Sequence, residues 1–202
     1  MHVVYQLTVG PVQEHPYFIV KDNKDTLIID PGDQVETIEQ LIAENQLNPV
    51  AILLTHAHFD HIGAVEDIRE RYNIDVWQHI IEADWLKDKQ TRVPKTRTHY
   101  WDKMGQHSVA GFTFKTAHVP GHSPGSVVYI FEEDGFVVAG DTLFKGTIGR
   151  TDLDHGDQDT LITGIKRHLL TLPDETQVLP GHGGITTIGQ EKANNPFLQG
   201  NL

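Results

Sequence analysis

Three imidazoles and one carboxylate fall within six residues of the chain, directly after the apolar run at residues 50–54. They are His56, His58, Asp60 and His61. The apolar run is typical of a buried strand, and helical periodicity resumes only after Gly63, so we expect the cluster on a loop between a strand and a helix. Unlike the helical His-Glu-x-x-His spacing, this spacing does not place its ligands on one helix face. Four ligand-type side chains that point in two directions indicate two metal ions.

Three more ligand-type residues occupy similar positions, each at the point where a predicted strand gives way to a turn rich in Gly or Pro. They are His122, Asp141 and His182. In open α/β sheets, the carboxyl ends of strands are where ligands bind and chemistry is usually located. We therefore expect the three residues to join the first cluster in one constellation.

Two divalent ions with imidazole and carboxylate ligands need about this many groups. One ion would lie on His56, His58 and His122 and the other on Asp60, His61 and His182, with Asp141 bridging them. Zinc suits such nitrogen and oxygen ligands best, and iron or manganese also accept them. A hydroxide bridging two such ions would attack a carbonyl at neutral pH, because metal binding lowers the pKa of water from ~15.7 to about 7. The pattern predicts a metal-dependent hydrolase in which Asp60 is both a ligand and the catalytic residue that orients the hydroxide.

Composition limits the possible partners. Lys and Arg total 16 against 28 Asp and Glu, a formal charge of −12, which argues against a general nucleic-acid or anionic-membrane surface. The chain has no cysteine, so disulfides, thiolate nucleophiles and Cys-ligated zinc are excluded. The amino terminus does not read as a signal peptide, and no apolar run approaches ~18 residues. We expect a cytoplasmic protein with a small-molecule substrate, of undetermined oligomeric state.

Hydrophobic periodicity predicts alternating strands and helices, which indicates an α/β protein. Strands are expected at residues 2–9, 17–21, 26–30, 50–54, 75–77, 112–118, 126–131, 136–139 and 176–179. Helices are expected from Val35 until Asn48-Pro49 ends the first one, from Gly63 to Tyr72, at 80–85 and at about 157–170. Residues 87–106 are polar and basic, so they are interpreted as a solvated surface excursion, with a lid over the site as the alternative.

The ordered set of seven ligand-type residues resembles the metallo-β-lactamase superfamily. Residues 140–144, 148–152 and 180–183 are similar to its glyoxalase II-like branch, the hydroxyacylglutathione hydrolases. The resemblance extends from Asp30 to residues 195–198. It implies a four-layer αβ/βα sandwich of two mixed β-sheets flanked by helices, with residues 1–202 forming a single domain. The helical carboxyl-terminal domain that holds glutathione in full-length glyoxalase II is not expected here.

The resemblance implies hydrolysis of thioesters of small thiols, such as S-lactoylglutathione or a related acyl-thiol. Arg150 falls where the family spacing places a cationic thiol-binding residue, so it is the candidate substrate contact. Class B1 β-lactamases use a Cys ligand, which disfavours that branch. Two alternatives stay open: a persulfide dioxygenase with one Fe(II) on His56, His122 and Asp141, and a lactone hydrolase that uses the same site.

Several other residues allow two interpretations each. Asp30 is either a turn former or an acceptor that orients a ligand histidine. Arg150 is either the substrate contact or a surface cation that pairs with Asp152 or Asp154.

Three histidines lie near the predicted turns, namely His15, His118 and His155. They are expected mainly to pack or to form hydrogen bonds. For His15 and His155, the alternative is a position beside the substrate.

Overall fold

The computed structural model describes residues 1–85, 93 and 96–200. The chain divides into two compact units. Unit 1 comprises Met1–Asp102 and Val109–Gly111, and unit 2 comprises Lys103–Ser108 and Phe112–Leu202. The candidate ligands are distributed over both units.

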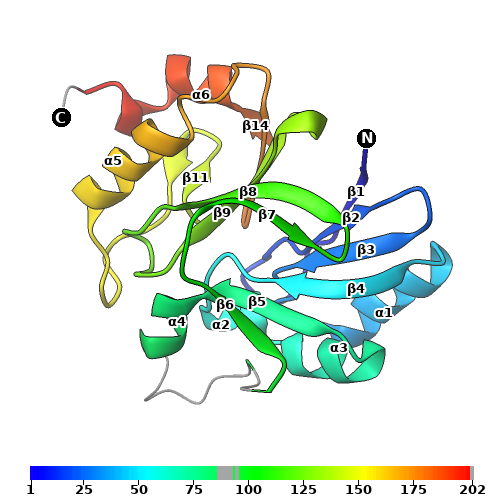
Figure 1. Ribbon diagram of the computed structural model, residues 1–202. Coiled ribbons are helices and arrows are strands. Elements are labelled where there is room, and N and C mark those ends of the chain that lie inside the picture. Colours follow the sequence, from blue (N-terminus) through cyan, green and yellow to red (C-terminus); the bar gives the residue numbers. More distant parts are fainter. Residues whose placement is uncertain (86–92, 94–95, 201–202) are drawn as a thin grey trace. The chain divides into compact units, whose positions relative to one another are not determined.

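Unit 1 is built on a six-stranded mixed sheet whose strands follow the order of the chain (Figure 1). The strands are β1 (Val3–Gln6), β2 (Tyr17–Val20), β3 (Asp25–Ile29), β4 (Asn48–Leu53), β5 (Asp75–His79) and β6 (Thr98–Trp101). The first three are antiparallel to one another, which confirms the predicted opening meander. From β3 onward each strand is parallel to its neighbour, so the carboxyl ends of β3, β4, β5 and β6 share one edge.

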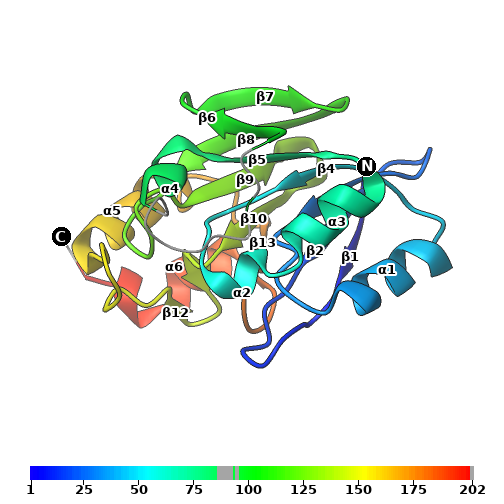
Figure 2. The same ribbon diagram turned by 90° about the horizontal axis from the view of Figure 1, so that it is seen from below.

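Four helices accompany this sheet, namely α1 (Val35–Glu44), α2 (Phe59–Ile62), α3 (Val65–Tyr72) and α4 (Ile80–Trp85). Ile38 and Ile42 of α1 and Ile68 of α3 belong to the same buried cluster as Ile28 and Ile52 of the sheet. Figure 2 shows α1 and α3 along one face of the sheet. The helical spacing of apolar residues predicted both helices because only that stripe contacts the sheet.

Unit 2 contains a second six-stranded mixed sheet, in the order β14, β13, β10, β9, β8, β7. Its strands are β7 (Gly105–Val109), β8 (Phe112–His118), β9 (Val127–Phe131), β10 (Phe136–Gly140), β13 (Gln177–Pro180) and β14 (Thr186–Thr187). The predicted hairpin of β9 and β10 is confirmed, with Phe136 opposite Phe131 and Gly135 in the left-handed conformation at the turn. The strands β10 and β13 are parallel neighbours.

The remaining elements of unit 2 are the small hairpin β11 (Leu143–Phe144) and β12 (Thr147–Ile148), the helices α5 (Gln158–His168) and α6 (Ile188–Asn194), and the 3-10 turns Glu132–Asp134 and Pro196–Leu198. Asp157 caps α5 by accepting a hydrogen bond from the Thr160 amide. Leu161 and Ile165 of α5 join the buried cluster of the second sheet.

Both units combine a mixed sheet with flanking helices, so the prediction of an α/β fold with two mixed β-sheets is confirmed. The assignment of residues 1–202 to a single domain stays a prediction. Among the helices that the structure describes, none has the length and apolar character needed to cross a membrane.

The sequence analysis missed two features. It predicted no strand in the excursion at 87–106, which contains β6 and the start of β7; Thr98–Trp101 is rich in β-formers although cations surround it. The His-rich segment is not all loop either, since α2 carries Asp60 and His61 on one helical turn. Four residues are too few for a helical period to be detected. The alternative of a lid depends on residues 86–92 and 94–95, which lie outside the described part of the chain.

Candidate metal centre

The first group of ligands leaves the edge of the unit 1 sheet where β3 and β4 end. Ile29 pairs with Leu53 in parallel register, so Asp30 and Thr55 follow adjacent strand ends. The chain then passes through His56 and His58 into α2. The imidazole centroids of His56 and His58 are 4.8 Å apart, and those of His56 and His61 are 4.1 Å apart. Strand ends and one helical turn therefore gather the four predicted ligands of this unit.

Asp30 forms hydrogen bonds with residues of this group. Its Oδ1 accepts a hydrogen bond from the Thr55 amide at 2.7 Å, and its Oδ2 accepts one from the Thr55 hydroxyl at 2.5 Å. The same Oδ2 lies 2.8 Å from His61 Nδ1. Asp30 is 2% exposed, so its carboxylate is held by these donors instead of water. Of the two interpretations of Asp30, the structure favours the acceptor that orients a ligand histidine.

These hydrogen bonds fix which nitrogen each imidazole presents. A carboxylate only accepts, so His61 Nδ1 must carry the proton that it shares with Asp30. The Thr55 hydroxyl donates its single proton to Asp30. In the 3.0 Å contact between the Thr55 hydroxyl and His56 Nδ1, the imidazole is therefore the donor. Both rings consequently present an unprotonated Nε2, which is the form that binds a metal ion.

Asp60 and His61 have the spacing of two ligands on one ion. His61 Nε2 lies 3.5 Å from Asp60 Oδ2. Metal–ligand bonds of about 2.0–2.2 Å in a tetrahedral shell place neighbouring donor atoms roughly 3.3–3.6 Å apart. The two atoms are therefore separated as the ligands of a shared ion would be.

Unit 2 contributes the second group. Asp141 and His182 follow β10 and β13, whose parallel register pairs Gly140 with Pro180. The Nε2 atoms of His122 and His182 each lie 3.4 Å from Asp141 Oδ2. His122 Nδ1 lies 2.8 Å from the Arg150 carbonyl oxygen, which can only accept, so His122 also presents Nε2. Two imidazole nitrogens and a carboxylate oxygen thus converge within this unit.

Each of the two groups has side chains of the types that bind a divalent metal ion. Every predicted ligand is an imidazole or a carboxylate, and within each unit they lie near one another at the carboxyl ends of the strands. Unit 1 supplies His56, His58, Asp60 and His61, and unit 2 supplies His122, Asp141 and His182. Because three rings are locked with Nε2 available, the residues fit zinc, iron or manganese.

Glycines make the close packing of the ligand segments possible. A Cβ on Gly32 would collide with the Asp60 carbonyl oxygen and the Glu14 carboxylate. On the other unit, a Cβ on Gly149 would collide with the Asp141 carbonyl oxygen. In each case the absent side chain lets another segment lie directly against the backbone of a ligand.

Arg150, which the sequence analysis predicted to contact the substrate, forms an ion pair with Asp152. Its guanidinium donates two hydrogen bonds to Asp152, at 2.8 and 2.9 Å, and both side chains are exposed. These bonds lower the pKa of Asp152 to about 2. The pair is therefore ionised at neutral pH, as in the alternative interpretation of Arg150.

The other histidines in question have distinct surroundings. The His118 Nε2 atom lies 2.8 Å from the Pro124 carbonyl oxygen, which agrees with the predicted hydrogen-bonding role. The imidazole of His15 is buried and contacts the Thr8 hydroxyl at 3.1 Å. By contrast, His155 is exposed and has a φ of 63°.

Three supporting groups escaped the sequence analysis. Glu82 of α4 is fully buried, and its Oε2 accepts a hydrogen bond from the Ala57 amide at 2.9 Å, between two ligand histidines. Thr55 and the Arg150 carbonyl orient His56 and His122. Of the three, Thr55 had a signal, because a hydroxyl beside a ligand cluster is a common hydrogen-bond partner. A distant carboxylate and a main-chain carbonyl have no such signal.

Tyr17 of unit 1 lies near the carboxylates of Glu14 and Asp30. Burial raises its pKa far above the usual value, and the nearby Glu14 and Asp30 carboxylates raise it further. Glu14 is itself buried, with Oε1 3.7 Å from His61 Nδ1. The Tyr17 hydroxyl is therefore neutral at any physiological pH.

Residues 9–182 match the family model described as the metallo-beta-lactamase superfamily. The chain is 44% identical over 205 residues to the probable metallo-hydrolase YqgX of Bacillus subtilis, covering 96% of this chain and 97% of YqgX. It is 36% identical over 203 residues to the hydroxyacylglutathione hydrolase GloC of Haemophilus influenzae, covering 95% and 96% of the two chains.

Solved structures agree with these similarities. The BLEG-1 B3 metallo-beta-lactamase matches with a TM-score of 0.93 and 41% identity, over 98% of this chain and all of that chain. TTHA1623, solved in a di-iron-bound form, matches with a TM-score of 0.87 and 38% identity, over 96% of this chain and all of that chain.

Proposed function

The chain belongs to the metallo-beta-lactamase superfamily, and from that premise we propose that it is a dinuclear metal-dependent hydrolase that cleaves thioesters of small thiols. The proposed substrate is S-lactoylglutathione or a related acyl-thiol. The similarity to the H. influenzae hydroxyacylglutathione hydrolase over nearly the whole of both chains supports this class of substrate.

The observation that carries the proposal is the common state of three ligand imidazoles. His56, His61 and His122 each donate Nδ1–H to a fixed acceptor and so present Nε2. We propose that these atoms, with His58, Asp60, Asp141 and His182, hold two divalent ions, zinc first among them. When bound, such ions supply Lewis acidity and a nucleophilic water at neutral pH.

In this proposal, Asp60 orients the water that attacks the thioester. Its side chain is 13% exposed, and its Oδ2 lies 3.5 Å from His61 Nε2. In the proposed role, the Asp60 carboxylate accepts a hydrogen bond from the attacking water and fixes its direction. The leaving thiol has a pKa near ~8.5, so it departs as a thiolate with little need for a general acid.

Arg150 is the proposed contact for an anionic thiol such as glutathione. A guanidinium binds a carboxylate through two parallel hydrogen bonds, and Asp152 provides that arrangement in the structure. A substrate carboxylate would replace Asp152 at little cost, because exposed ion pairs contribute little free energy.

The proposal is tested by measuring the metal content of the purified protein together with hydrolysis of S-lactoylglutathione before and after chelation. We expect about two ions per chain, loss of cleavage on chelation and recovery with zinc, iron or manganese. Asp60→Asn should lower kcat by at least about 100-fold, since general acid–base and positioning groups typically contribute 10²–10⁴-fold. The matched control is Asp22→Asn, which changes an exposed Asp on a turn.

A second candidate is an iron-dependent persulfide dioxygenase on His56, His122 and Asp141. The similarity to a protein solved in a di-iron-bound form makes iron a necessary ion to test. About one iron per chain, oxygen uptake with a persulfide and no thioester cleavage would replace the hydrolase with this oxygenase. Cleavage of a lactone but no thioester would instead change the substrate class.

A further inference from the structure

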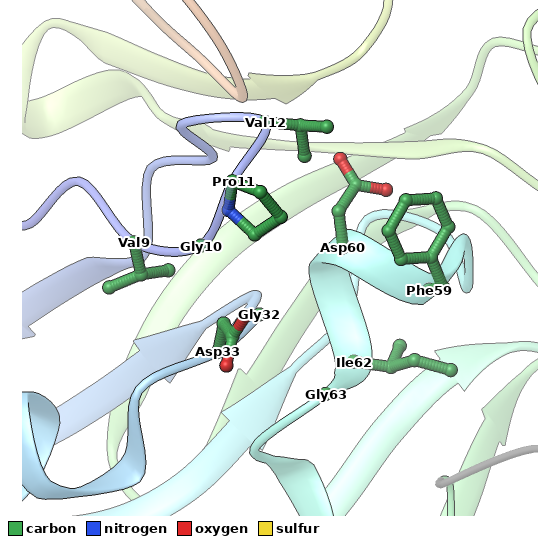
Figure 3. Close-up of a pocket in the computed structure, with 10 residues that line it drawn as sticks. All are labelled: Val9, Gly10, Pro11, Val12, Gly32, Asp33, Phe59, Asp60, Ile62 and Gly63. Atoms are coloured by element: carbon green, nitrogen blue, oxygen red, sulfur yellow. The ribbon is translucent and has the colours of Figure 1, made fainter.

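Unit 1 contains a pocket of about 280 Å³ beside Asp60 (Figure 3). The connection between β1 and β2 forms one wall, and α2 with its flanking residues forms the other. The lining residues are Val9, Gly10, Pro11, Val12, Gly32, Asp33, Phe59, Asp60, Ile62 and Gly63. The volume is just below the usual range for a whole small ligand, so the pocket suits one part of a substrate.

The pocket lining combines apolar side chains with polar surface, and the apolar side chains include Val12, Phe59 and Ile62. Phe59 is 73% exposed and Val12 is 45% exposed, although both are large hydrophobic side chains. Figure 3 shows the Asp60 carboxylate between these two side chains, with Pro11 on the Val12 side. Exposed apolar side chains gathered around a hollow indicate a binding surface, because covering them removes apolar area from water.

The charged groups in this lining are both carboxylates. Asp33 Oδ1 accepts a hydrogen bond from the Gln34 amide at 2.7 Å, and Asp60 belongs to the ligand group described above. Among the ten lining residues there is no Lys, Arg or His. These carboxylates disfavour an anionic occupant, and the exposed Val12 and Phe59 side chains offer apolar contacts to a neutral one.

We propose that this pocket binds the acyl chain of the substrate and selects apolar chains of short to medium length. This inference rests on the proposed thioesterase function. Asp60 links the two, because the residue that orients the attacking water also lines the pocket. The scissile carbonyl at Asp60 would direct one substituent between Val12 and Phe59. The acyl chain fits there better than a glutathione-like thiol, whose carboxylates would face Asp33.

The test is a series of thioesters with acetyl, butanoyl and hexanoyl groups on one neutral thiol, N-acetylcysteamine, and on glutathione. For the wild-type protein we expect kcat/KM to increase by up to about fourfold for each methylene that the pocket buries, on both thiols. A dependence on the acyl chain shared by both thiols assigns the effect to the acyl side.

Two variants localise the effect. Val12→Trp should fill the pocket, so the ratio of kcat/KM for the hexanoyl thioester to kcat/KM for the acetyl thioester should fall by at least about tenfold. Phe59→Ala should flatten the dependence on chain length. The matched controls are Val3→Trp, at an exposed Val of β1, and Phe197→Ala, at an exposed Phe outside the pocket. Neither control should change the dependence.

Binding can also be followed without turnover. Non-hydrolysable S-alkyl thioethers of the same lengths should shift the methyl NMR signals of Val12 and Ile62 in the wild-type protein. In Val12→Trp, the Ile62 signals should not shift. Acetyl cleavage with no dependence on chain length, or a dependence that survives Val12→Trp, would overturn the acyl pocket and leave the thioesterase standing. Failure to cleave any thioester would overturn both.

Discussion

His61 Nδ1 lies 2.8 Å from Asp30 Oδ2, and both side chains are buried. The same carboxylate holds Thr55, which in turn contacts His56. One side chain that binds no metal in the proposed ligand set therefore fixes the orientation of two ligand imidazoles. Its removal should affect metal binding more than folding.

Asp30→Asn should weaken the affinity for metal by about 10–100-fold, because an amide nitrogen would face donors that now share Oδ2. The affinity is measured by competition with a chelator of known strength, with circular dichroism to verify the fold. Asp22→Asn, at an exposed turn, is the control. An unchanged metal affinity in a folded Asp30→Asn protein would show that Asp30 does not orient the ligands.

Glu82 supports the segment between His56 and His58 through the Ala57 amide. Glu82→Ala should leave that buried amide without its side-chain acceptor, at a cost of about 1–3 kcal/mol in the free energy of unfolding. Glu82→Gln retains an acceptor and should recover most of the loss. Urea denaturation of the metal-free protein measures both, and Glu66→Gln on the exposed face of α3 serves as the control. Equal losses in the Ala and Gln variants would argue against the hydrogen bond.

Gly32 lies against the Asp60 backbone, where a Cβ cannot fit. Gly32→Ala should displace α2, so both the temperature of unfolding and the metal content should fall. Gly200→Ala is the control, since a Cβ there meets no atom within 4 Å. A Gly32→Ala protein with wild-type metal content would mean that the ligand turn tolerates the displacement.

Arg150 should affect KM more than kcat if it binds an anionic thiol. We expect Arg150→Gln to raise KM for S-lactoylglutathione by about tenfold and to leave the N-acetylcysteamine thioester unchanged. The control Arg71→Gln removes an exposed cation elsewhere. If KM changes equally for both thiols, Arg150 does not recognise thiol charge.

Asp75 should make stability depend on pH. Burial disfavours its charged form, but hydrogen bonds from His99 and Arg97 outweigh burial and lower the pKa of Asp75. A carboxyl whose pKa is lower in the folded state stabilises the protein above its unfolded pKa of about 3.9, and this contribution is lost as pH falls through the folded value.

Asp75→Asn should therefore be less stable than the wild-type protein at pH 7, and the difference should shrink below about pH 4. Urea denaturation over this range measures it, with Asp22→Asn as the control. A difference that stays constant with pH would exclude the ion pairs of Asp75 as its source.

The seven ligand-type residues and most elements could be predicted from the sequence, because both depend on local patterns. An apolar run predicted β4, alternation of apolar and polar residues predicted β8, and helical spacing predicted α1. Ligand types at strand ends predicted the metal chemistry, since parallel strands bring their carboxyl ends to one edge. By contrast, α2 and β6 were missed, because a four-residue helix has no detectable period and an edge strand among cations lacks an apolar run.

The sequence by itself determined which residues could bind metal and that they follow strand ends. Only the tertiary structure decided which nitrogen each histidine presents, because Asp30 meets His61 across 31 positions and the Arg150 carbonyl meets His122 across 28. It also decided that Glu82 supports Ala57 and that Val12 and Phe59 line one pocket. These are contacts between segments far apart in the chain, and no local pattern encodes them, since folding alone brings the partners together.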